Sequence, residues 1–265
     1  MDKEQREYYK EKAINTLGET RMMNCGEIAF IVDYKNTYNV IVQFKNTGEL
    51  VKCEYGQFKN GRVKSHFTPT VFGVGIVGLE STIDENNKNL KSYDTWRDML
   101  RRCYSNDYSE KHPTYKNVTC CDEWLYYSNF KEWYDKNIYY VENIVMNLDK
   151  DILVKGNKVY SPEMCIIVPQ NINKLFTKSD KTRGDLPIGI CMHGDKYKVS
   201  CGIFDVDTKK SRKEYIGVFD TVEYAFNKYK TIKENNIKNV AEYYKRLLPK
   251  KLYETMYNYK VEITD

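Results

Sequence analysis

The sequence predicts an α+β fold, and three observations predict it. Short β-branched and aromatic runs, separated by turn residues, fill the region from 24 to 68. Apolar residues at helical spacing follow between 92 and 137. The last third of the chain combines three strand-like runs with one long helical segment. We therefore expect several small parts, each built from a few strands and one or two helices.

Five segments are expected along the 265 residues. Residues 24–68 are predicted to form a small SH3-like β-barrel or curled meander. Residues 69–185 are predicted to form a central core of helices and a β-β-α unit. Residues 186–250 are expected to be a three-stranded sheet packed on one helix. The two ends, 1–23 and 251–265, are expected to be an N-terminal helix or arm and a tail.

Aromatic side chains supply much of the expected core. The chain has 24 Tyr, 10 Phe and 3 Trp, and its mean hydropathy is −0.69. No apolar run approaches the roughly 18–20 residues that cross a bilayer, and the first residues lack the apolar segment of a signal peptide. We expect a soluble, cytoplasmic chain without a membrane partner.

Cysteine and histidine do not have the spacing of a zinc site. The chain has 8 Cys and 3 His, and no two Cys form a CxxC pair. The adjacent residues Cys120 and Cys121 cannot chelate one ion in that manner. We expect buried free thiols in a reducing cytosol.

The first half of the chain reads as three strands followed by two helices. The strands are expected at 28–34, 38–44 and 49–55, with turns between them. One helix is predicted at 92–104, where Trp96, Met99, Leu100 and Cys103 fall on one face. A second is predicted at 122–137 with an aromatic stripe. Both stripes are interpreted as core.

The second half begins with a β-β-α unit. A strand is expected at 148–152, a second at 164–168, and a helix that begins near Pro169 and carries Asn173. Strands at 188–192, 196–204 and 213–219 and a helix at 220–236 follow.

The positive charge is concentrated in the C-terminal sheet and helix. From Leu186 to Lys250 there are 13 Lys and Arg against 8 Asp and Glu, and the resulting +5 equals the net charge of the whole chain. Alternation along the second strand places Lys196, Lys198 and Ser200 on one face. The third strand carries Arg212, Lys213 and Tyr215 nearby. This pattern favours a surface for double-stranded DNA, and a solvated sheet face is the alternative.

The same segment resembles an AP2-type DNA-binding domain. The matching text is Ile188-Gly189-Ile190, Lys196-Tyr197-Lys198-Val199, Tyr215-Ile216-Gly217-Val218-Phe219-Asp220-Thr221, Glu223-Tyr224-Ala225 and Tyr229. The resemblance implies a three-stranded sheet laid in the DNA major groove, with basic side chains on its exposed face.

The central segment looks like the HNH (ββα-metal) core of phage homing endonucleases. The resemblance rests on four stretches of sequence. They are the predicted helix from Trp96 to Tyr104, Cys121-Asp122-Glu123-Trp124 with Asn129-Phe130, Leu148-Asp149-Lys150-Asp151, and Val168-Pro169 with Asn173. It implies a strand His as general base, an adjacent acid and a helix His or Asn that hold a divalent metal, and a central Asn that orients the His.

Carried over residue by residue, the metal ligands are Asp149 and Asn173, for Mg²⁺ or another divalent cation. Lys150 stands where the general base is expected, and a lysine of ordinary pKa is protonated and cannot accept a proton. Asp151 could replace it, but strand alternation points it away from Lys150. The central Asn position falls on Met164. His112 is the nearby His before the motif that could act instead.

The two resemblances imply a phage-type DNA-binding protein, related to HNH homing endonucleases, that nicks DNA weakly or not at all. Its location would be the cytoplasm of a bacterial host. The alternative is a catalytically inactive binding protein that inhibits a host protein, for example an anti-defence protein. RNA binding through the 24–68 segment is a third possibility, but no aromatic ladder interleaved with Lys and Arg supports it.

Overall fold

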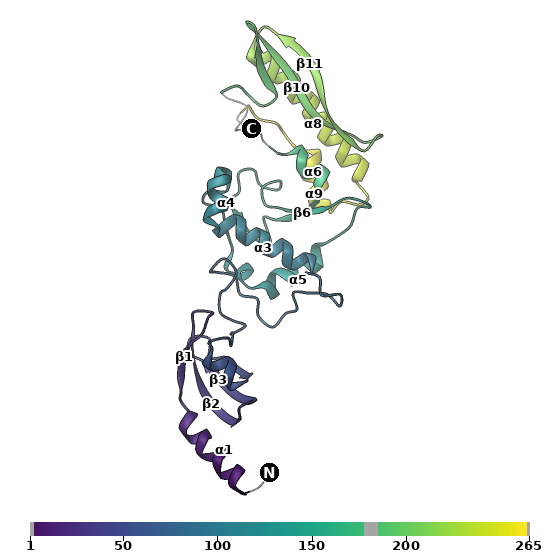
Figure 1. Cartoon of the computed structure of the whole chain (residues 1–265). Coiled ribbons are helices and arrows are strands. Elements are labelled where there is room, and N and C mark those ends of the chain that lie inside the picture. Colours follow the sequence, from purple (N-terminus) through teal and green to yellow (C-terminus); the bar gives the residue numbers. More distant parts are fainter. Residues whose placement is uncertain (1–2, 178–184, 264–265) are drawn as a thin grey trace. The chain divides into compact units, whose positions relative to one another are not determined.

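The computed structural model describes residues 3–177 and 185–263, and the fold is α+β as expected (Figure 1). The chain divides into two compact units, Met1–Tyr134 and Asp135–Asp265, which are described separately. This division falls inside the segment 69–185 that was predicted as one central core. Within the described ranges, no helix combines the length and the apolar character that a membrane span needs.

The first unit begins with helix α1 (Lys3–Thr16) and an antiparallel sheet. Its strands are β1 (Thr20–Met22), β2 (Ile28–Asn36), β3 (Asn39–Phe44) and β4 (Leu50–Cys53), in the order β1-β2-β3-β4, and helix α2 (Tyr55–Lys59) follows. The three expected strands are confirmed, and β1 was not predicted. The sheet is an open meander and not a closed barrel, because the two short edge strands β1 and β4 each pair with one neighbour.

One face of this meander is the core of the segment 24–68. Along β3, and along β2 as far as Ile31, buried and less buried residues alternate, as expected for a sheet with one covered face. Beyond Ile31 a register shift moves the next buried residue of β2 to Tyr34. The core side chains include Ala29, Ile31, Val40, Val42, Phe44 and Phe58.

The rest of the first unit is helical and is built around aromatic side chains. It contains α3 (Lys91–Tyr104), α4 (Asn106–Lys111), short 3₁₀ turns at Pro113–Tyr115 and Asp122–Leu125, strand β5 (Thr119–Cys120) and all but the last three residues of α5 (Tyr127–Asn137). Trp96 and Trp124 are buried, and the indole N–H of Trp96 donates to the carbonyl of Trp124 at 2.7 Å. The aromatic stripes are therefore core, as the sequence predicted.

The second unit starts with the β-β-α segment. Strand β6 (Met146–Asp149) pairs antiparallel with β8 (Ile166–Pro169), β7 (Val159–Tyr160) lies between them in the chain, and helix α6 (Gln170–Leu175) follows β8 directly. The expected order is confirmed. The first strand lies earlier than expected and ends at Asp149, so Lys150 and Asp151 lie outside it, in a bend.

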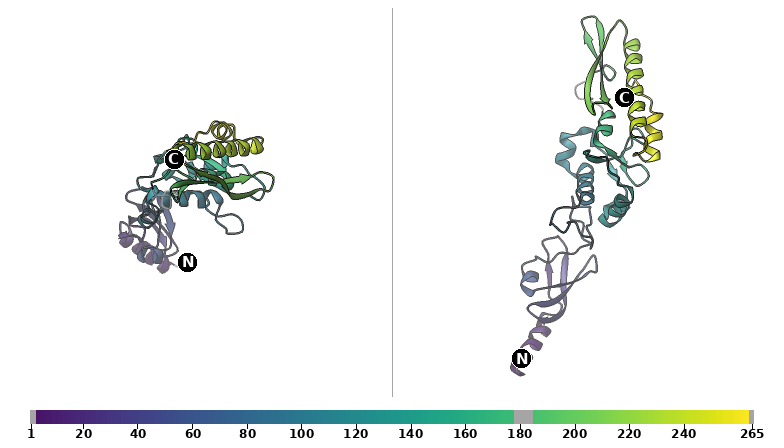
Figure 2. Two further views of the ribbon diagram at one scale, coloured as in Figure 1. Left: turned by 90° about the horizontal axis from the view of Figure 1, so that it is seen from above. Right: turned by 90° about the vertical axis from the view of Figure 1, so that its right-hand side faces the viewer.

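A three-stranded sheet and two helices complete this unit. The strands are β9 (Ile190–His193), β10 (Lys196–Asp205) and β11 (Lys210–Phe219), with β10 in the centre, and the helices are α8 (Val222–Tyr244) and α9 (Lys250–Tyr257). Helix α8 covers one face of the sheet (Figure 2, right). Val199, Cys201 and Ile203 of β10 pack there against Ala225, Phe226 and Tyr229.

The β-β-α segment and the C-terminal sheet share a hydrophobic core. Ile166, Val168, Ile172 and Leu175 belong to the same buried cluster as Phe204 of β10, Ile237 and Val240 of α8, and Leu252 and Met256 of α9. Residues 251–257, expected as part of a tail, thus form a helix that contributes two side chains to this core. Only Leu252 and Met256 of this segment are buried, and their spacing along α9 explains why the segment is helical.

Helix α8 also supplies hydrogen bonds along the edge of β10. Strand β9 pairs only with Lys196–Val199 of β10. Beyond it, the side-chain amide of Asn236 accepts from the N–H of Phe204 at 3.0 Å and donates to its carbonyl at 2.8 Å. The amide therefore takes the place of a neighbouring strand at this position.

Replacing this amide is expected to destabilise the second unit. Asn236→Ala leaves the N–H and the carbonyl of Phe204 without their partners in a partly buried place, which costs about 1–3 kcal/mol. Urea unfolding measures the loss. Asn239→Ala, an exposed position on the same helix, is the matched control, and equal midpoints for the two variants would contradict the assigned role of Asn236.

Candidate nucleic-acid interface and the β-β-α unit

The face of the C-terminal sheet opposite α8 gathers most of the residues predicted to bind DNA. In the strand register Lys196 lies opposite His193, and Lys198 opposite Cys191. Ser200 lies opposite Tyr215, and Gly202 opposite Lys213. Directly paired residues share a face, so these eight residues define what we call the open face: Cys191, His193, Lys196, Lys198, Ser200, Gly202, Lys213 and Tyr215.

Side-chain contacts on the open face agree with this register. The Lys198 ammonium lies 5.7 Å from the centre of the Tyr215 ring, and Tyr215 is 61% exposed. The Lys196 ammonium lies 2.7 Å from the Asp220 carboxylate, and the hydrogen bond that it donates to Asp220 raises the pKa of Lys196. Because both partners are exposed, this ion pair contributes little to stability. Lys213 is exposed.

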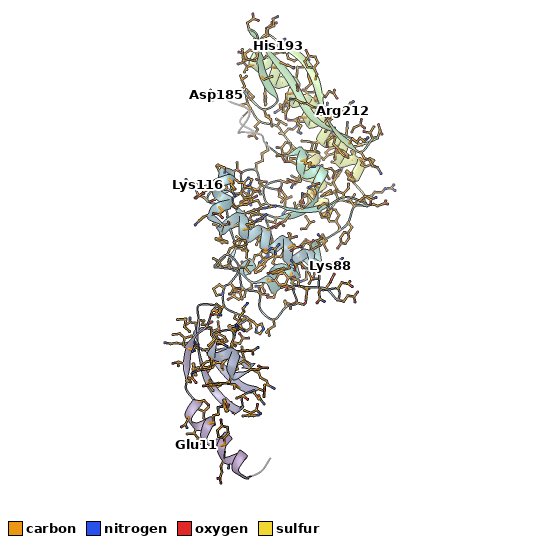
Figure 3. The ribbon with its side chains drawn as sticks, viewed as in Figure 1. Glu11, Lys88, Lys116, Asp185, His193 and Arg212 are labelled. Carbon is orange, nitrogen blue, oxygen red and sulfur yellow. The ribbon has the colours of Figure 1, made fainter. Side chains whose placement is uncertain are left out.

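Arg212 is separated from the other predicted DNA-binding residues. The register shifts between Val199 and Ser200, where β11 carries Ile216 as an extra residue. Below this bulge Arg212 pairs with Ile203, and Glu214 with Cys201, so both lie toward the α8 side of the sheet. The Arg212 guanidinium is 3.2 Å from the carboxylate of Glu214. Figure 3 labels Arg212 on β11 and His193 on β9, in the same sheet.

The Asp149-Lys150-Asp151 segment forms a hydrogen-bonded bend. Asp149 Oδ1 accepts from the N–H groups of Asp151 at 2.9 Å and Ile152 at 2.7 Å. The Lys150 ammonium donates to Asp151 Oδ2 at 3.0 Å. The expectation that Asp151 points away from Lys150 is therefore wrong. Strand alternation does not apply, because β6 has already ended at Asp149.

Asn157 holds the other side of this bend. Its side-chain amide donates to the carbonyls of Lys150 and Val159, both at 2.7 Å. The main-chain carbonyl of Asn157 accepts a hydrogen bond from the Lys150 ammonium at 2.9 Å. Met164, where the resemblance places the central Asn, is 36% exposed. Sequence reasoning missed Asn157, although its place directly after Gly156 marks it as a turn residue.

Asp149 is the residue of this segment whose pKa is raised. Burial and the neighbouring Asp151 carboxylate raise the pKa of Asp149 to about 6, against the effect of two backbone N–H groups. A carboxyl group in this range can exchange a proton near neutral pH. The Lys150 side chain is buried and its ammonium already donates to two oxygens, which is the arrangement of a structural cation.

The predicted metal ligands lie in one β-β-α unit. Asp149 ends β6, and Asn173 lies on α6, a helix that packs against β6 and β8. Carboxylate and amide oxygens are ligands that suit Mg²⁺. In the part of the chain that the structure describes, no group of three or more His, Cys, Asp or Glu side chains has the arrangement of a metal site. His112 belongs to the first unit, where the centre of its ring lies 4.3 Å from that of Tyr108, with the two ring planes tilted by 31°.

Comparison of this chain with protein-family models, with curated proteins and with solved structures finds no match.

Proposed function

We propose that this chain binds double-stranded DNA through the open face of its C-terminal sheet. The observation that carries the proposal is the asymmetry of that sheet. One face packs on α8, and the other presents Lys196, Lys198, Lys213 and the exposed ring of Tyr215. A sheet of this kind fits the major groove, where lysines neutralise phosphates and polar side chains reach base edges.

The double variant Lys198→Gln with Lys213→Gln tests this proposal. Because each lysine that contacts a phosphate releases about one counterion, we expect weaker binding and a slope of log Kd against log salt that falls by about 2. The measurement is a fluorescence titration of a labelled duplex in EDTA at several salt concentrations.

Lys228→Gln is the matched control for that titration. Lys228 is exposed on α8, where its ammonium lies 5.1 Å from the ring of Tyr224. We expect its affinity and salt slope to equal those of the unchanged protein. A loss of affinity as large as that of the double variant would show that net charge, and not the open face, governs binding.

We further propose that the β-β-α unit is an HNH-like nuclease core that nicks DNA weakly or not at all. The hydrogen bonds of Lys150 support the loss of a general base, since an ammonium that donates to two oxygens does not accept a proton. A divalent cation would be held by Asp149 and Asn173. Plasmid nicking with Mg²⁺ or Mn²⁺, compared with Asp149→Ala, tests this, and rapid metal-dependent nicking would contradict it.

An inactive protein that binds and inhibits a host protein is the second candidate. It is favoured by the exposed face of the meander, where Met22 on β1 is 60% exposed and Leu50 on β4 is 61% exposed. Such apolar residues on one surface are typical of a protein contact. Retention of a bacterial protein that is lost in the Met22→Ser, Leu50→Ser variant would support this candidate, and equal retention by both forms would contradict it.

A further inference from the structure

Gly202 is a glycine that the fold of the described chain does not require. It lies in the middle of β10 between the buried residues Cys201 and Ile203, yet it is itself exposed. Its backbone is outside the left-handed region, and a Cβ atom added there would meet no atom within 4 Å. Gly189 is the contrast, because its φ is +79° and a Cβ would lie 2.3 Å from the ring of Tyr229. A glycine inside a strand costs stability and often marks a place where a ligand approaches the main chain closely.

A buried cation lies beside this glycine. Lys233 of α8 is only 9% exposed, and its ammonium donates to the carbonyl of Gly202 at 3.2 Å. Among residues 3–177 and 185–263, no carboxylate lies within ion-pair distance of this ammonium. Burial lowers the pKa of Lys233. A buried ammonium without a counter-charge is costly, and an external anion beside it would offset this cost.

We propose that Gly202 and Lys233 form a phosphate contact at the edge of the open face. A phosphate of the nucleic-acid backbone approaches the main chain of β10 at Gly202, where no side chain intervenes, and is stabilised by the charge of Lys233. Lys198 and Lys213 flank this point on the same face. The proposal rests on the proposed DNA binding. It adds Lys233, which comes from the helix on the opposite side of the sheet and which the side-chain alternation and the charges of β10 do not indicate.

Two variants test the contact from its two sides. Lys233→Met removes the charge and keeps the length of the side chain, and we expect duplex DNA to bind at least fivefold more weakly, with a salt slope lower by about 1. Gly202→Val places a branched side chain on the open face, and we expect at least a tenfold loss. The melting temperature of Gly202→Val should not fall, because the added Cβ meets no atom within 4 Å and valine favours strands.

Two controls separate this contact from the proposed function. Lys228→Met removes an exposed lysine from the same helix, and it should bind DNA as the unchanged protein does. If Gly202→Val and Lys233→Met also bind as the unchanged protein does, while the Lys198→Gln, Lys213→Gln variant binds more weakly, the phosphate contact is wrong and DNA binding through the open face stands.

If the unchanged protein does not bind duplex DNA, a titration with inorganic tripolyphosphate still tests the anion site. We expect the backbone amide signal of Gly202 to move on titration in NMR spectra, and to move less in Lys233→Met. A shift without DNA binding would support the anion site and overturn the proposed function. No shift of the Gly202 signal would overturn the site.

Discussion

A chain shortened to end at Asn258 is expected to lose most of the stability of its second unit. The removed segment contains Val261, which is 4% exposed in the core between the sheet and α8, and Tyr259, whose ring packs edge-on against Phe176 at 4.9 Å. It also carries polar anchors: the N–H of Val261 donates to Glu234 at 2.8 Å, and its carbonyl accepts from Lys230 at 2.6 Å. We expect a loss on the order of 3–5 kcal/mol from the buried side chains and broken hydrogen bonds.

Urea unfolding followed by circular dichroism measures this loss. A chain ending at Glu262 is the control, because it keeps Tyr259 and Val261 and removes Ile263, which is 50% exposed. It should unfold at the midpoint of the full chain. If both shortened chains unfold at the same urea concentration as the full chain, the segment after α9 does not stabilise the unit.

Asp149→Asn is expected to stabilise the protein above neutral pH by about 3 kcal/mol. The pKa of Asp149 in the folded state is raised to about 6, mainly by burial and then by the Asp151 carboxylate, from an ordinary value of 3.8. The asparagine keeps the Oδ1 atom that accepts from the N–H groups of Asp151 and Ile152. The substitution therefore removes the cost of the ionised carboxyl group and retains its hydrogen bonds.

The pH dependence of this gain follows from the direction of the shift. Between pH 3.8 and 6 the folded state binds more protons at Asp149 than the unfolded state. The stabilisation that Asp149 gives the unchanged protein is therefore fully present below pH 3.8 and is lost as the pH rises through 6. The gain of Asp149→Asn should be near zero at pH 3.5 and should reach its full size at pH 8. A gain that is the same at both pH values would contradict the raised pKa.

Asp151→Asn and added Mg²⁺ complete this test. Asp151 pairs with the buried ammonium of Lys150, so its loss is expected to destabilise the protein at pH 8, opposite in sign to Asp149→Asn. If Asp149 ligates a divalent cation, Mg²⁺ should raise the melting temperature of the unchanged protein and not that of Asp149→Asn. A carboxylate kept at the expense of stability is typical of a functional site.

The spacing of apolar and β-branched residues correctly predicted those helices and strands that such a local pattern marks. The apolar spacing of Trp96, Met99 and Leu100 predicted α3, and all three residues are buried. The β-branched and aromatic runs at 28–34 and 38–44 predicted β2 and β3. Neither pattern depends on distant parts of the chain, because the period of the side chains follows from the geometry of the backbone.

The bend at Asp149 shows where such reasoning fails. Strand alternation assigned Asp151 to the face opposite Lys150, but the strand ends one residue before the lysine. The side chain of Asn157, seven residues farther along, then closes the bend. Where a strand ends depends on the partner strand β8 and on such hydrogen bonds, and not on the propensity of the segment.

The sequence by itself determined the α+β class, the order of most strands and helices, and the concentration of positive charge in residues 186–250. The tertiary structure decided which charged residues share a face. One extra residue at Ile216 reverses the phase of β11, so Lys213 and Tyr215 join Lys198 while Arg212 turns to the other side. Only the packing of α8 brings Lys233 to Gly202, 31 residues earlier in the chain. A bulge and a helix–sheet contact are set by long-range packing, which a periodic pattern does not encode.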